Sequence, residues 1–324
     1  MKYQLIDLLV TQKDWRYSAF VPEQSELAGA QVFCIDNVDN FFWSNFEKYK
    51  DLYGFPNVAP PFDNYFMYCD ETERTNDDGS RYRDLYPSYR YGLWFLAAPI
   101  MDCPDIAIDW FADNGTNRLK LRNEGAKWSV LFAAFSSYNK REAISHAWGQ
   151  YVVNEDGSIN ELGTEIKCSS SLVSAMSQRY SFSEEECAEN VFNAASVELA
   201  ACWLATSLLH CKNVVHVDQA PNAKQAFRAR EFQKKTGKPA AKWKVLKIEP
   251  MVRVLREEGG LEGNGITQAL HICRGHFKDY SQGKGLFGRA KGLYWWDQHM
   301  RGNESAGVVI KDYKVAPGAS AVNP

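Results

Sequence analysis

A helix predicted over residues 183–210 constrains the fold of this chain more than any other segment. Ser183 and Glu186 have the spacing of a capping box, and three consecutive glutamates at 184–186 favour the positive end of a helix. The residues that follow are apolar almost all round the helix: Val191, Ala194, Ala195, Val197, Leu199, Cys202, Trp203, Leu208 and Leu209. A surface helix has one apolar stripe, so this helix is expected to be central and buried.

Segments with strand character precede this helix. Residues 64–69, 127–138 and 146–153 are rich in β-branched and aromatic side chains, and the last run ends at the turn-forming sequence 154–157. We therefore predict an α+β fold, with one or more antiparallel sheets around a long buried central helix. In this interpretation residues 1–180 form an aromatic-rich, acidic and mostly β N-terminal part.

The C-terminal part is expected to be basic and rich in β-strands. A helix over residues 223–236 has recognised signals at both ends, after Pro221-Asn222 and before Gly237. Strands are predicted at 213–217, 243–248, 271–278, 293–296 and 307–315. Residues 181–315 would form this part and residues 316–324 a frayed tail, although a single integrated domain fits equally well.

The net charge of −3 conceals an uneven distribution. Residues 211–315 hold 20 Lys and Arg but only 10 Asp and Glu, whereas the rest of the chain holds 17 basic and 30 acidic side chains. Such asymmetry suggests that one part meets a polyanion. The alternative is that the acidic and basic parts pack against each other and neutralise.

Cysteine usage and hydropathy bear on the setting of the protein. The eight cysteines are dispersed and form no C-x-x-C pair, which favours a reducing compartment. No apolar run approaches the roughly 18 residues of a membrane span. The N-terminus carries Asp7 in its short apolar stretch and no small-residue cleavage site, so we expect no signal peptide and no membrane association. The expected location is cytoplasmic.

Two C-terminal histidines are candidate catalytic residues. Metal-independent cleavage of RNA needs a base for the 2′-hydroxyl proton, an acid for the leaving oxygen, and cations for the phosphate charge. His276 and His299 could be the acid–base pair, because imidazole titrates near neutral pH. If 271–278 is one strand, Arg274, His276 and Lys278 share a face. The candidate phosphate-binding cations are Arg274, Lys278 and Arg301.

Basic residues alternate with aromatic ones between and around these histidines. Single-stranded nucleic acid is bound by such a mixture, with cations for the backbone and rings for base stacking. The further substrate-binding candidates are Lys212, Lys284, Arg289, Tyr294 and Trp296. Against this stands the possibility that His276 is an ordinary strand histidine and that the basic helix is a solvated surface.

Other chemistries find less support in the sequence. There is no G-x-x-x-x-G-K-[ST], G-x-G-x-x-G or G-x-S-x-G motif. His271, Cys273 and His299 could bind zinc, but no other ligand pair has recognised spacing. We therefore expect no metal and no cofactor.

Segments of the last third resemble a family of uncharacterised proteins carried by phages, prophages and other bacterial mobile elements. They are Cys-Lys-Asn-Val at 211–214, His-Ile-Cys-Arg-Gly-His-Phe-Lys at 271–278, Leu-Phe-Gly at 286–288, Tyr-Trp-Trp at 294–296, His-Met-Arg-Gly at 299–302 and Gly-Val-Val-Ile-Lys-Asp-Tyr at 307–313. The resemblance implies a bacterial or phage cytoplasm and a part in phage–host conflict. The family has no established activity, so it assigns no catalytic residue.

Together these features favour a nucleic-acid-binding protein, RNA before DNA, acting as a metal-independent ribonuclease or related phosphodiesterase. One alternative is a non-catalytic anti-defence inhibitor that binds a host defence protein through an acidic, DNA-like surface at 184–189 and 70–78. Another is an enzyme acting on a nucleotide or NAD-like small molecule. The sequence gives no oligomeric state.

Overall fold

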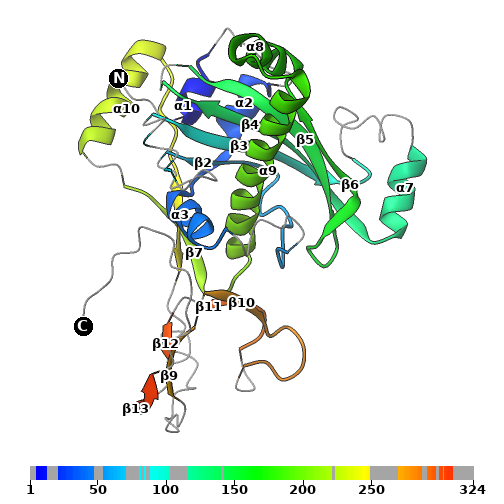
Figure 1. The fold of residues 1–324 in the computed structure, drawn as a ribbon, viewed down its shortest axis with the longest axis vertical. Helices are drawn as coiled ribbons and strands as arrows, with labels where there is room; N and C mark the ends of the chain where they lie inside the picture. The colour runs from blue at the N-terminus through cyan, green and yellow to red at the C-terminus, as the bar shows by residue number, and fades with distance from the viewer. Residues whose placement is uncertain are drawn as a thin grey trace. The chain divides into compact units, whose positions relative to one another are not determined.

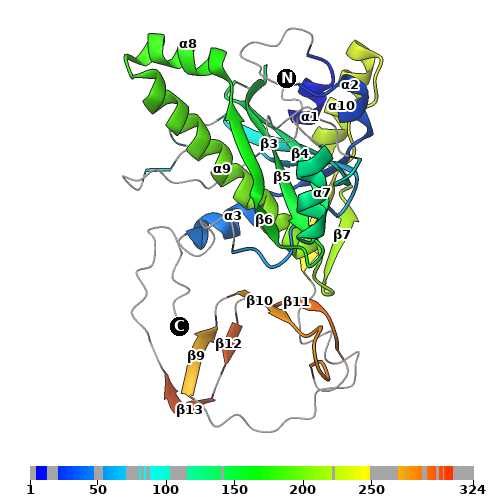
Figure 2. The same cartoon turned by 90° about the vertical axis from the view of Figure 1, so that its right-hand side faces the viewer.

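The structure of the chain is a computed structural model. It describes residues 5–12, 21–46, 54–70, 80–81, 84, 88–102, 115–139, 142–220, 223–248, 269–273, 275–286, 290–296, 299–301 and 303–308. The chain divides into two compact units (Figures 1 and 2). The larger comprises Met1–Leu209 with His216–Leu246, and the smaller comprises His210–Val215 with Lys247–Pro324.

The helices and strands have the following bounds. The helices are α1 (Leu5–Leu9), α2 (Gln24–Gly29), α3 (Asp36–Ser44), α7 (Gly115–Asn123), α8 (Ser170–Tyr180), α9 (Glu184–Leu209) and α10 (Ala223–Thr236). The first eight strands are β1 (Gln31–Cys34), β2 (Asn64–Cys69), β3 (Arg90–Pro99), β4 (Ala126–Ser137), β5 (Ile144–Asn154), β6 (Ile159–Cys168), β7 (Val214–Asp218) and β8 (Lys244–Ile248). The remaining strands are β9 (Ala269–Cys273), β10 (His276–Asp279), β11 (Leu293–Trp296), β12 (His299–Arg301) and β13 (Asn303–Val308).

An eight-stranded mixed sheet runs through the larger unit, in the order β6-β5-β4-β3-β2-β1-β8-β7. The strands from β2 to β6 pair antiparallel, whereas β1 pairs parallel with both β2 and β8. The antiparallel pairs join strands that are consecutive in the chain, whereas the parallel pairing of β1 with β8 joins segments that are far apart in it. The end of β4 and the start of β5 therefore lie side by side.

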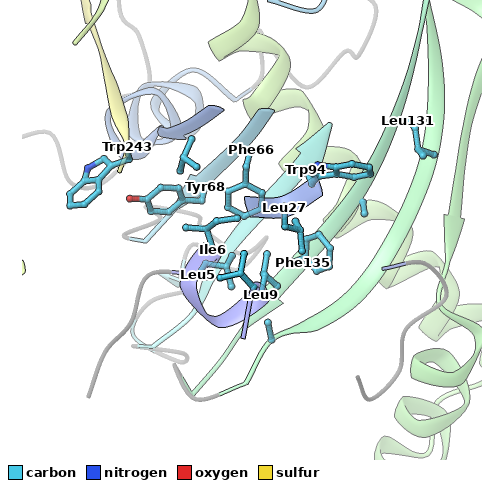
Figure 3. Packing of buried hydrophobic residues seen from close by; sticks show 14 of the residues in the cluster. Leu5, Ile6, Leu9, Leu27, Phe66, Tyr68, Trp94, Leu131, Phe135 and Trp243 are labelled. Atoms are coloured by element: carbon cyan, nitrogen blue, oxygen red, sulfur yellow. The ribbon is translucent and has the colours of Figure 1, made fainter. Parts of the chain in front are cut away.

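Helices cover both faces of the central sheet (Figures 1 and 2). On one face, side chains from α1, α2 and α10 pack against alternate residues of β2, β3 and β4 (Figure 3). Phe66 and Tyr68 point to this face, because residues two apart in a strand share a side. Tyr65 and Phe95 stack at 4.7 Å between ring centroids and belong to the opposite face, where Tyr151 of β5 meets Trp203 of α9 at 5.0 Å.

Helix α9 is the central helix that the sequence predicts. Its N-terminus carries the expected capping box, in which the backbone N–H of Glu186 donates to Ser183 Oγ at 3.1 Å and that of Ser183 donates to Glu186 Oε2 at 2.8 Å. The helix is long and apolar enough to cross a membrane by length and composition, but 72% of its apolar window is buried in the protein. This corrects the expectation that no apolar segment approaches the length of a membrane span, and the burial is that of a helix in the protein core.

Comparison with the expectations confirms the α+β class, the mostly antiparallel sheet and the long helix. The first hundred residues, which belong to the part expected to be mostly β, contain α1, α2 and α3 beside β1. The structure places α9 with the N-terminal sheet in the larger unit, so the units divide at other points than residue 180. Residues 309–324, with most of the last predicted strand and the tail, lie outside the described residues.

At Gly149, strand β5 lies very close to its neighbours β4 and β6. A Cβ on Gly149 would lie 2.1 Å from the carbonyl oxygen of Glu165 and 3.0 Å from the ring of Phe132. Gly149→Ala is therefore expected to lower the free energy of unfolding by about 1–3 kcal/mol, because a backbone atom cannot move aside cheaply. Urea unfolding measures this. Gly29→Ala is the matched control, since its Cβ would meet only Asn64 Nδ2 at 3.7 Å; equal effects at both positions would contradict the prediction.

Candidate functional site

The smaller unit places part of the predicted site on a two-stranded antiparallel ribbon formed by β10 and β11. His276 lies opposite Trp296 in this ribbon, and Lys278 lies opposite Tyr294. Directly paired residues of an antiparallel ladder share a face, as do residues two apart in one strand. These four residues therefore occupy one face, which we call the ribbon face.

The ribbon face combines a cation, an aromatic ring and an imidazole. Lys278 is exposed, and its Nζ lies 5.0 Å from the centroid of the half-buried Trp296 ring, within the range of a cation–π contact. His276 is half-buried beside them. Tyr294 is only 4% exposed and packs in a small cluster with Ala290, Tyr280, Leu286 and Trp296. The Tyr294 ring is therefore covered within the ribbon face, and Trp296 is the aromatic residue with exposed surface there.

The opposite face of the ribbon is anchored in the protein. Trp295 is 1% exposed and meets Phe277 edge-on, with the ring centroids 4.8 Å apart. The side-chain amide of Asn213 pairs with the backbone of β11 as a neighbouring strand would. Its Nδ2 donates to the Trp295 carbonyl at 2.7 Å, and its Oδ1 accepts from the Trp295 N–H at 2.9 Å. These bonds join two segments 82 residues apart in the chain. They hold β11 in place and so fix the ribbon face.

Lys212, which immediately precedes Asn213, also lies next to the ribbon. Its backbone N–H donates to the Leu293 carbonyl at 2.8 Å. A Cβ on Gly292, whose φ is +117°, would lie 3.2 Å from Cγ and Cε of the lysine, so the exposed side chain of Lys212 passes over this glycine. Lys284, another predicted cation, is exposed in the loop between β10 and β11. Lys212 and Lys284 thus add positive charge around the ribbon.

The structure corrects one premise of the sequence interpretation. Residues 271–278 are not a single strand: β9 ends at Cys273, and β10 begins at His276 in a different sheet. The alternation of side chains between two faces therefore ends at this break. It gives no reason to place Arg274 on the face of His276 and Lys278. A glycine at position 275 interrupts the pattern, because glycine is unfavourable inside a strand.

The remaining predicted residues are only partly described. β12 pairs antiparallel with β9, which sets His299 opposite Cys273 and Arg301 opposite His271 in the register. The side chains of His299 and Arg301 lie outside the description, as do Arg274 and Arg289 altogether. Of the predicted site, the described part brings together His276, Lys278, Tyr294, Trp296 and Lys212.

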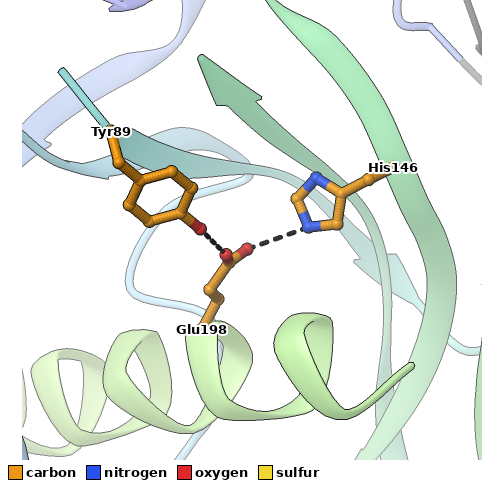
Figure 4. Close-up of polar contacts among 3 residues, drawn as sticks. All are labelled: Tyr89, His146 and Glu198. Atoms are coloured by element: carbon orange, nitrogen blue, oxygen red, sulfur yellow. Dashed lines mark hydrogen bonds and ion pairs between the residues drawn. The ribbon is translucent and has the colours of Figure 1, made fainter. Parts of the chain in front are cut away.

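A second polar cluster, not anticipated from the sequence, lies in the larger unit (Figure 4). Glu198 projects from the middle of α9 and is 3% exposed. Its Oε2 is 3.0 Å from Nε2 of His146 on β5, and its Oε1 accepts a hydrogen bond from the hydroxyl of Tyr89, which immediately precedes β3. All three residues are at most 5% exposed, so the cluster is removed from bulk water.

A neighbouring pair extends this polar layer between the sheet and the helices. The hydroxyl of Tyr91 donates to Oδ1 of Asp39 on α3 at 2.5 Å. Burial, with the nearby Asp39 carboxylate, raises the pKa of Tyr91 well above its usual value, so the phenol stays protonated as a donor. Cys202, one turn beyond Glu198 on α9, is likewise held as a thiol, because burial and the Glu198 charge raise its pKa.

The sequence carried one signal for this cluster. Glu198 is a lone acidic residue within the apolar part of α9, and a buried carboxylate needs partners. Its partners could not be found from spacing, because His146 is 52 residues away and Tyr89 is 109 residues away.

The acidic surface of the inhibitor alternative is described in part. The glutamates at 184–186 and Glu189 are exposed. Asp70 pairs with the buried Arg90 at 3.5 Å, so this carboxylate neutralises a buried cation. Residues 71–78 lie outside the description. Within the described ranges no group of three or more His, Cys, Asp or Glu side chains could hold a metal ion.

Comparison of the chain with protein-family models, with curated proteins and with solved structures found no match. The resemblance of the last third to phage-borne proteins therefore stays a prediction.

Proposed function

We propose that the smaller unit binds single-stranded RNA on the ribbon face and cleaves it without a metal ion. The observation that carries this proposal is the Lys278 ammonium held 5.0 Å from the Trp296 ring, on the same face as His276. A base can stack on an exposed aromatic ring while the adjacent ammonium meets the phosphate. Lys212 and Lys284 add charge along the path of the backbone.

In the proposed reaction, one histidine of the pair His276 and His299 removes the proton of the 2′-hydroxyl. The 2′-oxygen forms a bond to phosphorus, and the bond from phosphorus to the 5′-oxygen breaks. The other histidine, protonated, donates its proton to that leaving oxygen. Lys278 and the other cations stabilise the charge that develops on the phosphate. This reaction requires RNA, because DNA has no 2′-hydroxyl.

The proposed setting is the cytoplasm, in phage–host conflict. None of the six cysteines whose side chains the structure describes is in a disulfide, which supports a reducing compartment. The buried character of α9 is consistent with a soluble protein.

Binding is tested with a fluorescently labelled single-stranded RNA and anisotropy titrations. Trp296→Ala is expected to weaken binding by about 1–3 kcal/mol, a factor of about 5 to 150 in Kd, because one base loses its stacking partner. Tyr180→Ala, which removes an exposed aromatic ring from the larger unit, is the matched control and should bind as the unaltered protein does. Equal affinity of the Trp296→Ala variant, or no binding by the unaltered protein, would overturn the proposal.

The salt dependence of binding tests the role of Lys278 separately. Lys278→Ala is expected to reduce the slope of log K against log salt by about 0.7, the value for one phosphate contact on a single strand. The titrations are repeated at several salt concentrations with the same RNA. An unchanged slope would show that this ammonium does not meet a phosphate.

A further inference from the structure

The strand that carries His146 is irregular at this residue. Along the β4–β5 ladder, Ser145 is paired with Phe135 and Ala147 with Ala134, so His146 is an extra residue without a partner on β4. This arrangement is a β-bulge, which turns a side chain away from the regular alternation and is frequent beside active sites. The carbonyl of His146 accepts a hydrogen bond from the N–H of Ser169 at 2.9 Å, which fixes the bulge from the other side.

The hydrogen bonds of Glu198 determine which nitrogen of His146 carries the proton. A carboxylate accepts hydrogen bonds, so Oε1 accepts from the Tyr89 hydroxyl and Oε2 accepts from Nε2–H of His146 (Figure 4). In the neutral imidazole Nδ1 then holds a lone pair. Nδ1 is buried and has no hydrogen-bond partner among the described residues. An unsatisfied buried acceptor costs about 1–3 kcal/mol, so in a native structure it is accounted for by strain, by a bound water or ligand, or by a catalytic role.

The surroundings restrict what could approach this nitrogen. Glu198 and Asp39 are both buried carboxylates on the α9 side of the sheet, which disfavours an anionic ligand. An acceptor nitrogen requires a donor, that is, an O–H or N–H group. The Tyr89 ring is 5.0 Å from the ring of Tyr138, which is 44% exposed, so the cluster lies one aromatic layer below the surface.

We propose that His146, Glu198 and Tyr89 form a second acid–base site, which takes a neutral small molecule bearing a hydroxyl group. The hydroxyl donates its hydrogen bond to Nδ1 of His146. In a proton transfer the O–H bond breaks and an N–H bond forms at Nδ1, while the Glu198 carboxylate stabilises the resulting imidazolium. Glu198 and Tyr89 are positioning residues in this site. The site is independent of the ribbon face and of RNA.

The experiment uses diethyl pyrocarbonate on the folded full chain, followed by peptide mass spectrometry, at a pH where imidazole is neutral. The carbonyl carbon of the reagent forms a bond to an unprotonated imidazole nitrogen while its bond to the bridging oxygen breaks, and the ethyl carbonate that leaves takes a proton from water and decomposes to ethanol and carbon dioxide. The Nε2 proton passes to Glu198. His216, which is exposed on β7, serves as the internal reference for reagent activity.

His146 is expected to be labelled in the folded protein. In Glu198→Gln its labelling should slow by about threefold or more, because the ring loses the carboxylate that makes Nδ1 nucleophilic. In Tyr89→Phe labelling should quicken, because the carboxylate no longer shares its charge with the phenol. Tyr89→Phe also keeps the test valid if Glu198→Gln does not fold. The proposal is overturned if His216 is labelled and His146 is not, or if neither variant changes the rate at His146. RNA is absent throughout, so the ribbon-face proposal stands or falls separately.

Discussion

Glu198→Ala is expected to lower the free energy of unfolding of the larger unit by about 3–5 kcal/mol, the usual cost of removing one partner from a buried ionic or hydrogen-bonded pair. The carboxylate is 3% exposed and accepts from both His146 and Tyr89. Its removal leaves two buried donors without an acceptor and also leaves a cavity beside α9. Glu198→Gln should cost less, since the amide fills the same volume and keeps one acceptor oxygen.

Urea unfolding followed by circular dichroism measures this loss. Glu189→Ala is the matched control, because it removes an exposed glutamate from the same helix and is expected to change stability by no more than about 0.5 kcal/mol. Comparison of the two variants thus separates the effect of losing a buried carboxylate from the effect of changing the charge of the helix. If Glu198→Ala unfolds at the same urea concentration as Glu189→Ala, the cluster contributes nothing to the fold.

His276→Ala is expected to slow RNA cleavage by about two to four orders of magnitude, the usual contribution of one acid–base group. His276 shares the ribbon face with Lys278 and Trp296, where the proposed RNA would lie. Its imidazole is therefore placed to exchange a proton with RNA bound there. The measurement is the rate of cleavage of labelled RNA in EDTA, which removes divalent metal ions from the reaction.

His216→Ala supplies the control for cleavage. This histidine is exposed in β7, and its ring contacts Phe33 and Phe62 of the larger unit at 6.1 and 6.0 Å between centroids. Its loss should leave the cleavage rate unchanged. Equal rates for the unaltered protein and His276→Ala would refute catalysis by this histidine, and the anisotropy titrations would still decide whether the ribbon binds RNA.

Local sequence signals were sufficient for many elements of this fold. The predicted bounds of α10 and β11 agree with the structure, and the strand predicted at 64–69 is β2. The capping box at Ser183 formed as expected. These elements are recoverable because caps, turn residues and hydrophobic periodicity act over a few residues.

The candidate sites depended on pairings that act over long distances. The sequence predicted His276, Lys278 and Trp296 as site residues, but only the register of β10 with β11 sets them on one face. The same topology breaks the strand predicted at 271–278 into two strands of different sheets.

What the sequence determined by itself is the α+β class, the buried central helix and the basic, aromatic character of the C-terminal part. The tertiary structure alone decided that Glu198 meets His146 and Tyr89, and that β1 pairs parallel with β8. The physical reason is that helix caps and periodicity arise from neighbouring residues. Partners for a buried carboxylate, and the neighbours of a strand, are chosen by packing among segments that the chain brings together only when it folds.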